Sequence, residues 1–171
     1  MRKKTLIQKS KYINHYLSRK KTGCVGDILS ILQTMKKINL KNEHSRKNKL
    51  FRNRTATQIL KDGFTTGCTD DSIVFIAMAK TKGFSPLYIE ALEKKWLNAP
   101  MSERRVRGHA FVMIKNLLID PQRKQICADP NRIFSRYEIF GTGKEPYDLG
   151  LFDLKTSIQE FMDFKKNYKN N

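Results

Sequence analysis

The sequence has few cysteines and no long apolar segment. Three of its 171 residues are cysteines, at positions 24, 68 and 127, and no C-x-x-C pair occurs. This excludes a disulfide framework and argues against a zinc knuckle. No run approaches the ~18 apolar residues that a membrane-spanning helix needs, and Lys9 and Lys11 interrupt any signal-peptide core after Leu6 and Ile7. We therefore expect a cytoplasmic protein without a membrane span.

Acidic residues are scarce as well, above all in the first third of the chain. The chain carries 34 Lys and Arg against 16 Asp and Glu, and residues 1–54 hold 16 of those cations with only 2 of the acids. Such a segment attracts polyanions or acidic partners, although charge blocks are often merely solvated tails. Nucleic acid is left open as a partner. The charge of this segment favours it, but no zinc-finger, helix-turn-helix or RNA-binding signature identifies it.

The length and the hydrophobic content of 39% suit one domain with a buried core. We predict a basic N-terminal extension over 1–51 with one or two helices, a folded domain over 52–165 and a polar tail over 166–171. Within the extension, the spacing of apolar residues predicts a short helix before residue 22. A second helix is predicted over 28–38, with Asp27 as its N-cap, followed by a polar loop over 41–53.

The apolar run 73–79 is the centre of the predicted domain. A helix is expected first over 55–60, ending at Gly63. The run itself has hydroxyl and acidic side chains before it and Lys80, Lys82 and Gly83 after it, as the two ends of a helix require. A helix that is apolar on almost all sides is buried on all sides. We therefore predict a central helix over 68–82, with Cys68 in its first turn.

Strands are predicted after this helix, over 87–92, 109–114, 117–120 and 133–140, and a closing amphipathic helix over 154–164. A polar surface loop is expected from residue 98 to residue 107. The two residues Lys115 and Asn116 separate the second and third strands, which is typical of a tight antiparallel hairpin. In such a hairpin the first residue of one strand lies near the last residue of the next. The hairpin therefore predicts that His109 lies beside Asp120.

Cys68, His109 and Asp120 have the side chains of a nucleophile, a general base and an orienting acid. A thiol attacks as the thiolate, which the start of a helix and a neighbouring imidazolium both favour. Asp70 and Asp71 oppose it through their charge. The alternatives are an inert buried thiol, which is the expectation for Cys24 and Cys127, and a zinc site built from the triad residues and Cys127. His15 and His44 are expected at the surface.

Four segments of the sequence carry a resemblance to a known family. They are Gly63-Phe64-Thr65-Thr66-Gly67-Cys68-Thr69-Asp70-Asp71-Ser72, Ala79-Lys80-Thr81-Lys82-Gly83-Phe84-Ser85-Pro86-Leu87-Tyr88, Gly108-His109-Ala110-Phe111-Val112 and Leu118-Ile119-Asp120-Pro121. Together they resemble the transglutaminase-like superfamily of papain-like cysteine folds over roughly residues 52–122. The resemblance implies an α+β fold, in which a central cysteine-bearing helix packs on an antiparallel sheet bearing the histidine and the aspartate.

The resemblance implies catalytic roles for Cys68, His109 and Asp120, with no cofactor and no metal. The expected activity is thiol-dependent acyl transfer on amide or peptide bonds of a protein or peptide substrate, with hydrolysis favoured over transfer to an amine. The backbone N–H of Cys68 is one expected oxyanion donor, and Gln58 or Asn53 is a candidate for a second. The alternatives are a protein-glutamine transglutaminase and a non-catalytic binding module that uses the basic arm. Arg104, Arg105 and Arg107 are expected to guide an acidic substrate.

Overall fold

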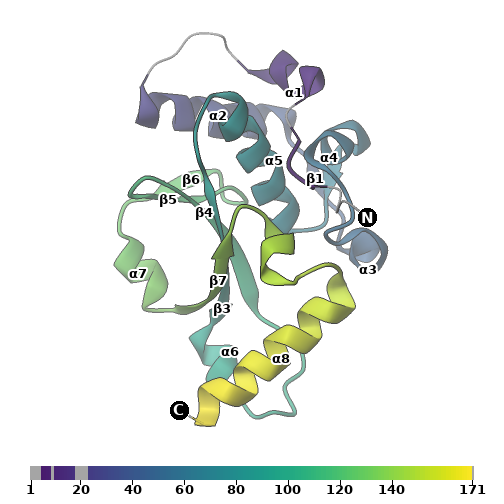
Figure 1. Ribbon diagram of the computed structural model, residues 1–171, viewed down its shortest axis with the longest axis vertical. Helices are drawn as coiled ribbons and strands as arrows, with labels where there is room; N and C mark the ends of the chain where they lie inside the picture. The colour runs from purple at the N-terminus through teal and green to yellow at the C-terminus, as the bar shows by residue number, and fades with distance from the viewer. Residues whose placement is uncertain (1–4, 9, 18–22, 171) are drawn as a thin grey trace.

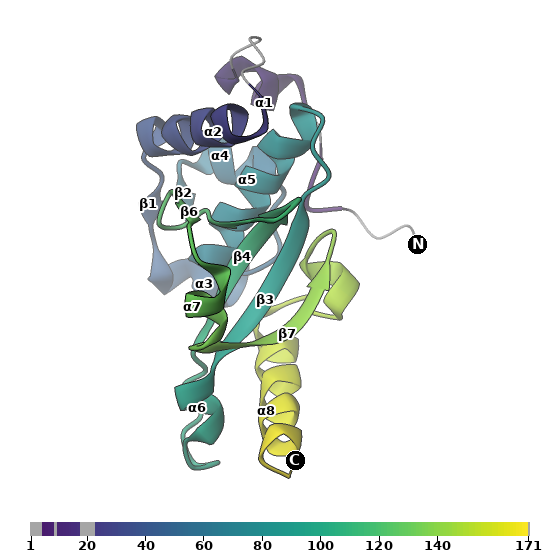
Figure 2. The ribbon, with the colours of Figure 1, turned by 90° about the vertical axis from the view of Figure 1, so that its left-hand side faces the viewer.

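A five-stranded antiparallel sheet forms the middle of the molecule (Figures 1 and 2). The computed structural model describes residues 5–8, 10–17 and 23–170. The strand order is β6-β5-β4-β3-β7. The strands are β3 (Leu87–Glu93), β4 (Gly108–Ile114), β5 (Leu117–Asp120), β6 (Gln125–Cys127) and β7 (Tyr137–Gly143). A separate parallel pair joins β1 (Lys41–Asn42) to β2 (Phe64–Thr65).

Helix α5 (Cys68–Thr81) is the buried core helix that the sequence predicts. All of its residues from Thr69 to Ala79 are buried. It packs on β4 and β3 and is covered by α1 (Lys11–Tyr16), α2 (Cys24–Ile38) and α4 (Ala56–Asp62). The prediction of a helix enclosed on all sides is confirmed. Burial of its apolar residues fixes the start of α5, and therefore Cys68, against the sheet.

Local signals fix the elements that flank this helix. Thr55 caps α4 and forms a capping box with Gln58, and Gly63 ends the helix with a left-handed backbone, φ 74°. The β4–β5 hairpin is also as predicted, with Ile114 paired to Leu117 and Val112 to Ile119. Lys115 takes the positive φ of 54° that such a short turn needs.

The N-terminal segment shares the core of α5. Ile13, Ile28 and Met35 are buried in the same cluster as the apolar residues of α5, although residues 18–22 of the predicted extension lie outside the described residues. Helix α2 begins at Cys24 with Gly23 as its N-cap, so the prediction of Asp27 as the cap is wrong. Asp27 lies one turn inside the helix and pairs with Lys82 at 3.3 Å.

The predicted loop over 41–53 contains short regular elements. Besides β1, it forms the 3-10 turn η1 (His44–Arg46) and the single-turn helix α3 (Lys47–Leu50). Arg52, near its end, is fully buried. The predicted domain boundary at residue 51 is not marked by a change of core, and it stays a prediction.

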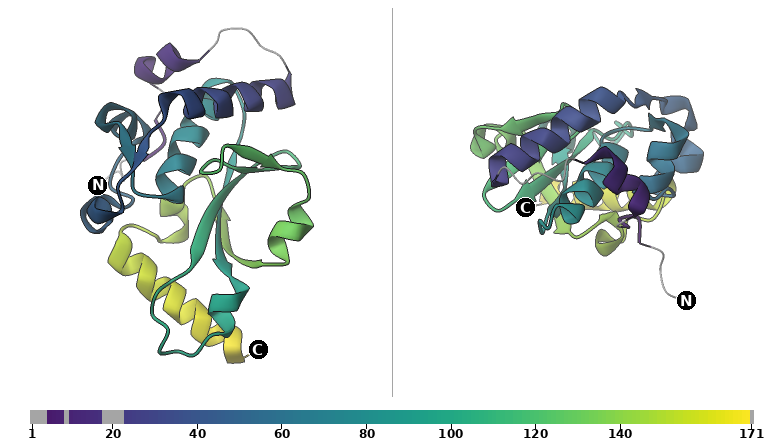
Figure 3. Two further views of the ribbon diagram at one scale, coloured as in Figure 1. Left: turned by 180° about the vertical axis from the view of Figure 1, so that it is seen from behind. Right: turned by 90° about the horizontal axis from the view of Figure 1, so that it is seen from above.

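The C-terminal third differs from the prediction in the unpredicted strand β6, in the predicted strand over 133–140 and in the predicted tail. The predicted strand over 133–140 is in part helical, because Asp129 and Pro130 start α7 (Pro130–Phe134), and β7 follows only at Tyr137. Helix α8 (Leu154–Asn170) runs through most of the predicted polar tail. It lies at the end of the molecule opposite α1 and α2, beside α6 (Lys94–Asn98) (Figures 1 and 3).

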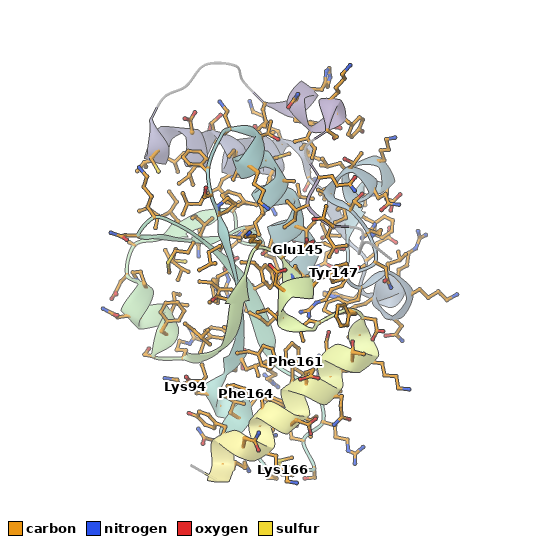
Figure 4. The ribbon with its side chains drawn as sticks, viewed as in Figure 1. Lys94, Glu145, Tyr147, Phe161, Phe164 and Lys166 are labelled. Carbon is orange, nitrogen blue, oxygen red and sulfur yellow. The ribbon has the colours of Figure 1, made fainter. Side chains whose placement is uncertain are left out.

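Buried contacts explain why α8 continues beyond the predicted helix. Lys165 is fully buried over the ring of Trp96, and its Nζ donates to the backbone oxygens of Pro100, at 3.0 Å, and Glu103, at 3.3 Å. Phe161 and Phe164, labelled in Figure 4, pack on Phe140 of β7. These contacts attach α8 both to the sheet and to the loop between α6 and β4.

Candidate active site

His109 and Asp120 form a buried hydrogen-bonded pair at the edge of the hairpin. His109 Nε2 lies 2.8 Å from Asp120 Oδ2. If the hairpin register is continued by one pair, Asp120 lies opposite Phe111. His109 precedes Phe111 by two residues and therefore lies on the same face of β4. The His109 ring rests edge-on against Phe111, with the ring centroids 4.6 Å apart. The predicted proximity of the histidine and the aspartate is confirmed.

Cys68 lies at the first position of α5 and acts electrostatically on His109. Burial lowers the pKa of His109, but the hydrogen bond with Asp120 and the neighbouring Cys68 sulfur outweigh this effect and raise that pKa to about 10. Burial also raises the pKa of Asp120, yet the bond to His109 and the Arg123 contacts bring it below its usual value. With Nε2 engaged by Asp120, Nδ1 is the ring nitrogen left for the thiol. The structure thus joins His109 to Asp120 by a hydrogen bond, and Cys68 is close enough to raise the pKa of the His109 ring.

Asp70 and Asp71, which the sequence expects to oppose a thiolate, each have a cationic partner. Asp70 Oδ2 accepts hydrogen bonds from Arg54 Nη2, at 2.6 Å, and from the N–H and the hydroxyl of Thr66. Asp71 Oδ1 forms a salt bridge with Lys124 Nζ at 2.6 Å. These pairs reduce the repulsion that the two carboxylates would exert on negative charge at Cys68.

A cavity of about 90 Å³ opens beside Cys68. Cys68 and Thr69 of α5 line it, as do Glu90 of β3 and Gly108, the residue before His109. Its other walls come from α3, α8 and the loop before β4: Lys47, Phe51, Val106, Leu154, Ser157, Ile158 and Phe161. The cavity is mainly apolar, with the carboxylate of Glu90 as its acidic group.

Glu90 belongs to a buried network that the sequence does not indicate. Its Oε2 accepts a hydrogen bond from Arg52 Nη2 at 2.5 Å and another from the hydroxyl of Tyr88. Arg52 also donates to Ser157 of α8, at 3.1 Å, and its backbone oxygen accepts from Tyr147, which follows β7 (Figure 4). A single buried guanidinium therefore joins β3, α8 and the segment before α4 around the cavity.

The two side chains predicted as oxyanion donors are engaged elsewhere. Gln58 Oε1 accepts from the backbone N–H of Thr55 within the capping box, and Asn53 Nδ2 donates to the backbone oxygen of Lys49. Neither residue lines the cavity beside Cys68, so a second side-chain donor stays a prediction. Within the described part of the chain, nothing accepts a hydrogen bond from the backbone N–H of Cys68 or Thr69. Both groups stand at a helix start, where such donors lack an intrahelical acceptor.

The remaining candidate residues lie apart from this group. Burial raises the pKa of Cys127, and the Asp120 charge adds to that rise; His15 and His44 are exposed. Arg104, Arg105 and Arg107 are exposed on the loop before β4, on either side of Val106 in the cavity wall. Among the described residues, no three His, Cys, Asp or Glu side chains are grouped to hold a metal ion. None of the helices described combines the length and the hydrophobicity needed to cross a bilayer.

The fold resembles that of a solved protein, although the sequence gives no such match. No family model and no curated protein matches the chain. Its structure is similar to the 1.9 Å crystal structure of a "Putative Cysteine Protease" from Cytophaga hutchinsonii, with a TM-score of 0.57 and 13% sequence identity. The similarity covers 85% of this chain and 48% of that protein, so the chain spans about half its length. At this identity the similarity shows a shared fold of mixed helix and sheet.

Proposed function

We propose that the protein catalyses thiol-dependent acyl transfer on amide or peptide bonds, with Cys68 as nucleophile, His109 as general base and acid, and Asp120 as the orienting group. The observation that carries this proposal is the buried hydrogen bond between His109 and Asp120, at 2.8 Å, with Cys68 at the start of α5 acting on the same ring. An imidazolium in this place stabilises a thiolate at neutral pH. The similarity in fold to a protein described as a cysteine protease supports the same function.

The chemistry follows from the placement of these groups. The Cys68 thiolate attacks the carbonyl carbon, and the oxygen takes up the negative charge within reach of the N–H groups of Cys68 and Thr69. His109 then passes its proton to the leaving nitrogen as the C–N bond breaks, which leaves a thioester on Cys68. Neutral His109 next takes a proton from water, the hydroxide adds to the thioester, and the thiolate leaves. Asp120 stabilises the charged ring in both half-reactions.

Hydrolysis is the proposed outcome, and transfer to an amine is the alternative. Fold analogy supports hydrolysis, because the solved protein of similar fold is described as a protease. A transglutaminase-like acyl transfer would use the same thioester and differ only in the nucleophile that resolves it. The proposed substrates are proteins or peptides, without a cofactor.

Selective alkylation of the native protein tests the proposal. Iodoacetamide at neutral pH should label Cys68 faster than Cys24 or Cys127, as read by peptide mass spectrometry, because of the three thiols only Cys68 acts on the His109 ring. His109→Ala should slow labelling of Cys68, whereas His44→Ala, at an exposed histidine, should leave it unchanged. Equal labelling of the three cysteines in both variants would contradict the proposal. It would favour a binding module that acts through the basic N-terminal segment.

A further inference from the structure

Glu90 lies on β3 beside an irregularity in the strand pairing. The pairing between β3 and β7 shifts register between Glu90 and Ala91. Such irregularities re-aim side chains and occur often beside active sites. Glu90 is 3% exposed, yet it lines the cavity that also contains Cys68. A carboxylate is therefore buried beside the proposed nucleophile, and the proposed chemistry gives it no task.

One oxygen of Glu90 is fully committed. Oε2 accepts from both Arg52 and Tyr88, and Arg52 is itself held by Ser157 and lies against the rings of Phe51 and Phe161. Burial and the Glu90 charge both raise the pKa of Tyr88, so its hydroxyl keeps the proton that it donates. These contacts fix the orientation of the carboxylate, because moving it would leave a guanidinium and a hydroxyl buried without their acceptor.

The other oxygen of Glu90 is not used by the protein. Oε1 lies 3.9 Å from the point that a Cβ on Gly108 would occupy, and Gly108 is part of the cavity wall. Across the described ranges of the chain, nothing donates a hydrogen bond to Oε1. Since Oε2 is turned toward Arg52 and Tyr88, Oε1 is the acceptor that the protein presents on the cavity side.

The charges around the cavity favour an uncharged group there. The Arg52 guanidinium balances the Glu90 carboxylate, and Lys47 lines the cavity with its Nζ over the Phe51 ring. A carboxylate beside Oε1 would place two hydrogen-bond acceptors together with no proton between them, and an ammonium group would meet the charges of Arg52 and Lys47. An uncharged N–H or O–H donor satisfies Oε1 without either conflict, and the volume of about 90 Å³ restricts the group to a small one.

We propose that Glu90 is a specificity-determining residue, whose Oε1 accepts a hydrogen bond from a small uncharged donor, an amide N–H or a hydroxyl, on the side chain next to the carbonyl that Cys68 attacks. This inference rests on the proposed function, because it requires a substrate bound at Cys68. Glu90 should favour substrates with Gln, Asn, Ser or Thr at that position over substrates with Glu or with an apolar side chain of similar shape.

Peptide vinyl sulfones of matched length, which trap a reactive thiolate, test this selection on the wild-type protein. Probes with Gln, Glu or Lys beside the reactive group, and a second pair with Thr or Val, are compared by their rate of labelling of Cys68. The Gln probe should react roughly 10- to 100-fold faster than the Glu probe, as expected for one hydrogen bond to a charged acceptor. Thr should exceed Val in the same direction. The Gln and Thr arms distinguish an amide donor from a hydroxyl donor.

Glu90→Gln supplies the second arm. Its amide can present an N–H to the cavity, so the preference for the Gln probe over the Glu probe should fall to about one or reverse. Glu93→Gln, on the same strand but outside the cavity wall, is the matched control and should keep the wild-type ratio. If Glu90→Gln does not fold, the wild-type probe series alone decides.

The outcomes separate this inference from the proposed function. Equal rates for all probes, or a preference for Glu or Lys, would overturn the role of Glu90 while fast, His109-dependent labelling by iodoacetamide still supported the nucleophile. A Cys68 that does not react with iodoacetamide would overturn the proposed function and this inference with it.

Discussion

Asp120 and Glu90 are two buried carboxylates of the same sheet, and they differ in the partner that each one holds. Asp120 faces His109, a group that can gain and lose a proton, whereas Glu90 faces Arg52, which keeps its charge at any pH that a folded protein meets. One pair is therefore suited to moving a proton, and the other to holding a fixed shape and charge. In this site, the partner of a buried carboxylate indicates its task better than its burial does.

The largest effect expected from this difference is on turnover. Asp120→Asn should lower the rate of peptide or amide hydrolysis by about 10³- to 10⁴-fold, because the ring loses the group that orients it and stabilises its charged form. Steady-state kinetics with a fluorogenic peptide that the wild-type protein cleaves would measure the loss. Asp129→Asn, at the cap of α7 away from the site, is the control. A loss below tenfold would mean that His109 acts without Asp120.

The next effect concerns stability and falls on the Glu90 pair. Arg52→Met should lower the free energy of unfolding by about 3–5 kcal/mol, because it leaves the Glu90 carboxylate buried without its cation. Arg52→Met with Glu90→Leu should recover much of that loss. Urea unfolding followed by circular dichroism measures both. If the single and double variants were equally unstable, the guanidinium would matter through its packing against Phe51 and Phe161 instead.

A smaller effect, the pH dependence of stability, distinguishes the His109–Asp120 pair from the Arg52–Glu90 pair. The folded-state pKa of His109 is about 10, above its ordinary value of 6.5, so its stabilisation is complete below pH 6.5 and is lost as the pH rises toward 10. The free energy of unfolding should therefore fall toward pH 10 in the wild type, and most of the fall should come above about pH 8, because at neutral pH the proton on His109 is the one that the proposed Cys68 thiolate has given up. The fall should be smaller in His109→Gln, in which no imidazolium can deprotonate. Urea unfolding at pH 6, 8 and 10 makes the comparison, and parallel curves for the two proteins would refute it.

The smallest effect is expected at a third carboxylate, Asp71, whose partner Lys124 is partly exposed. Lys124→Ala should slow iodoacetamide labelling of Cys68 about two- to fivefold, because the unpaired Asp71 charge then opposes the thiolate through a partly solvated path. Adding Asp71→Asn should restore the rate. No recovery in the double variant would show that Lys124 acts on Cys68 by another route.

The sequence predicts those parts of the site that depend on local signals. The two-residue turn at Lys115 and Asn116 places His109 near Asp120, and the charges and glycines at its ends mark α5 around Cys68. The pair of Arg52 and Glu90 is 38 residues apart in sequence, and its formation depends on how β3, α8 and the segment before α4 pack. Composition places Arg52 in a polar loop and Lys165 near a polar tail, because charged residues are rarely buried and only tertiary contacts show that these two are.

The place of Gln58 in the structure could have been predicted from the sequence. Thr55 and Gln58 have the spacing of a capping box, and that pattern assigns the Gln58 side-chain oxygen to the start of α4. The cap of α2 is a different case. Gly23 and Asp27 both precede apolar residues, so the sequence offers two starting points, and the helix begins at the earlier one.

Helix α8 lies where it could control how the proposed thioester is resolved. Leu154, Ile158 and Phe161 form an apolar wall of the cavity beside Cys68, and these three side chains offer no group that could order water. In the proposed reaction, the acyl-enzyme would be resolved by whichever nucleophile reaches it first, and its lifetime would depend on how well this wall excludes solvent. Trimming the wall at Phe161 would admit water and shift the partition between hydrolysis and aminolysis toward hydrolysis, which the product ratio with an added primary amine would show. In the proposed reaction, the choice between hydrolysis and transfer to an amine would depend less on Cys68, His109 and Asp120 than on how well the apolar wall of α8 excludes water.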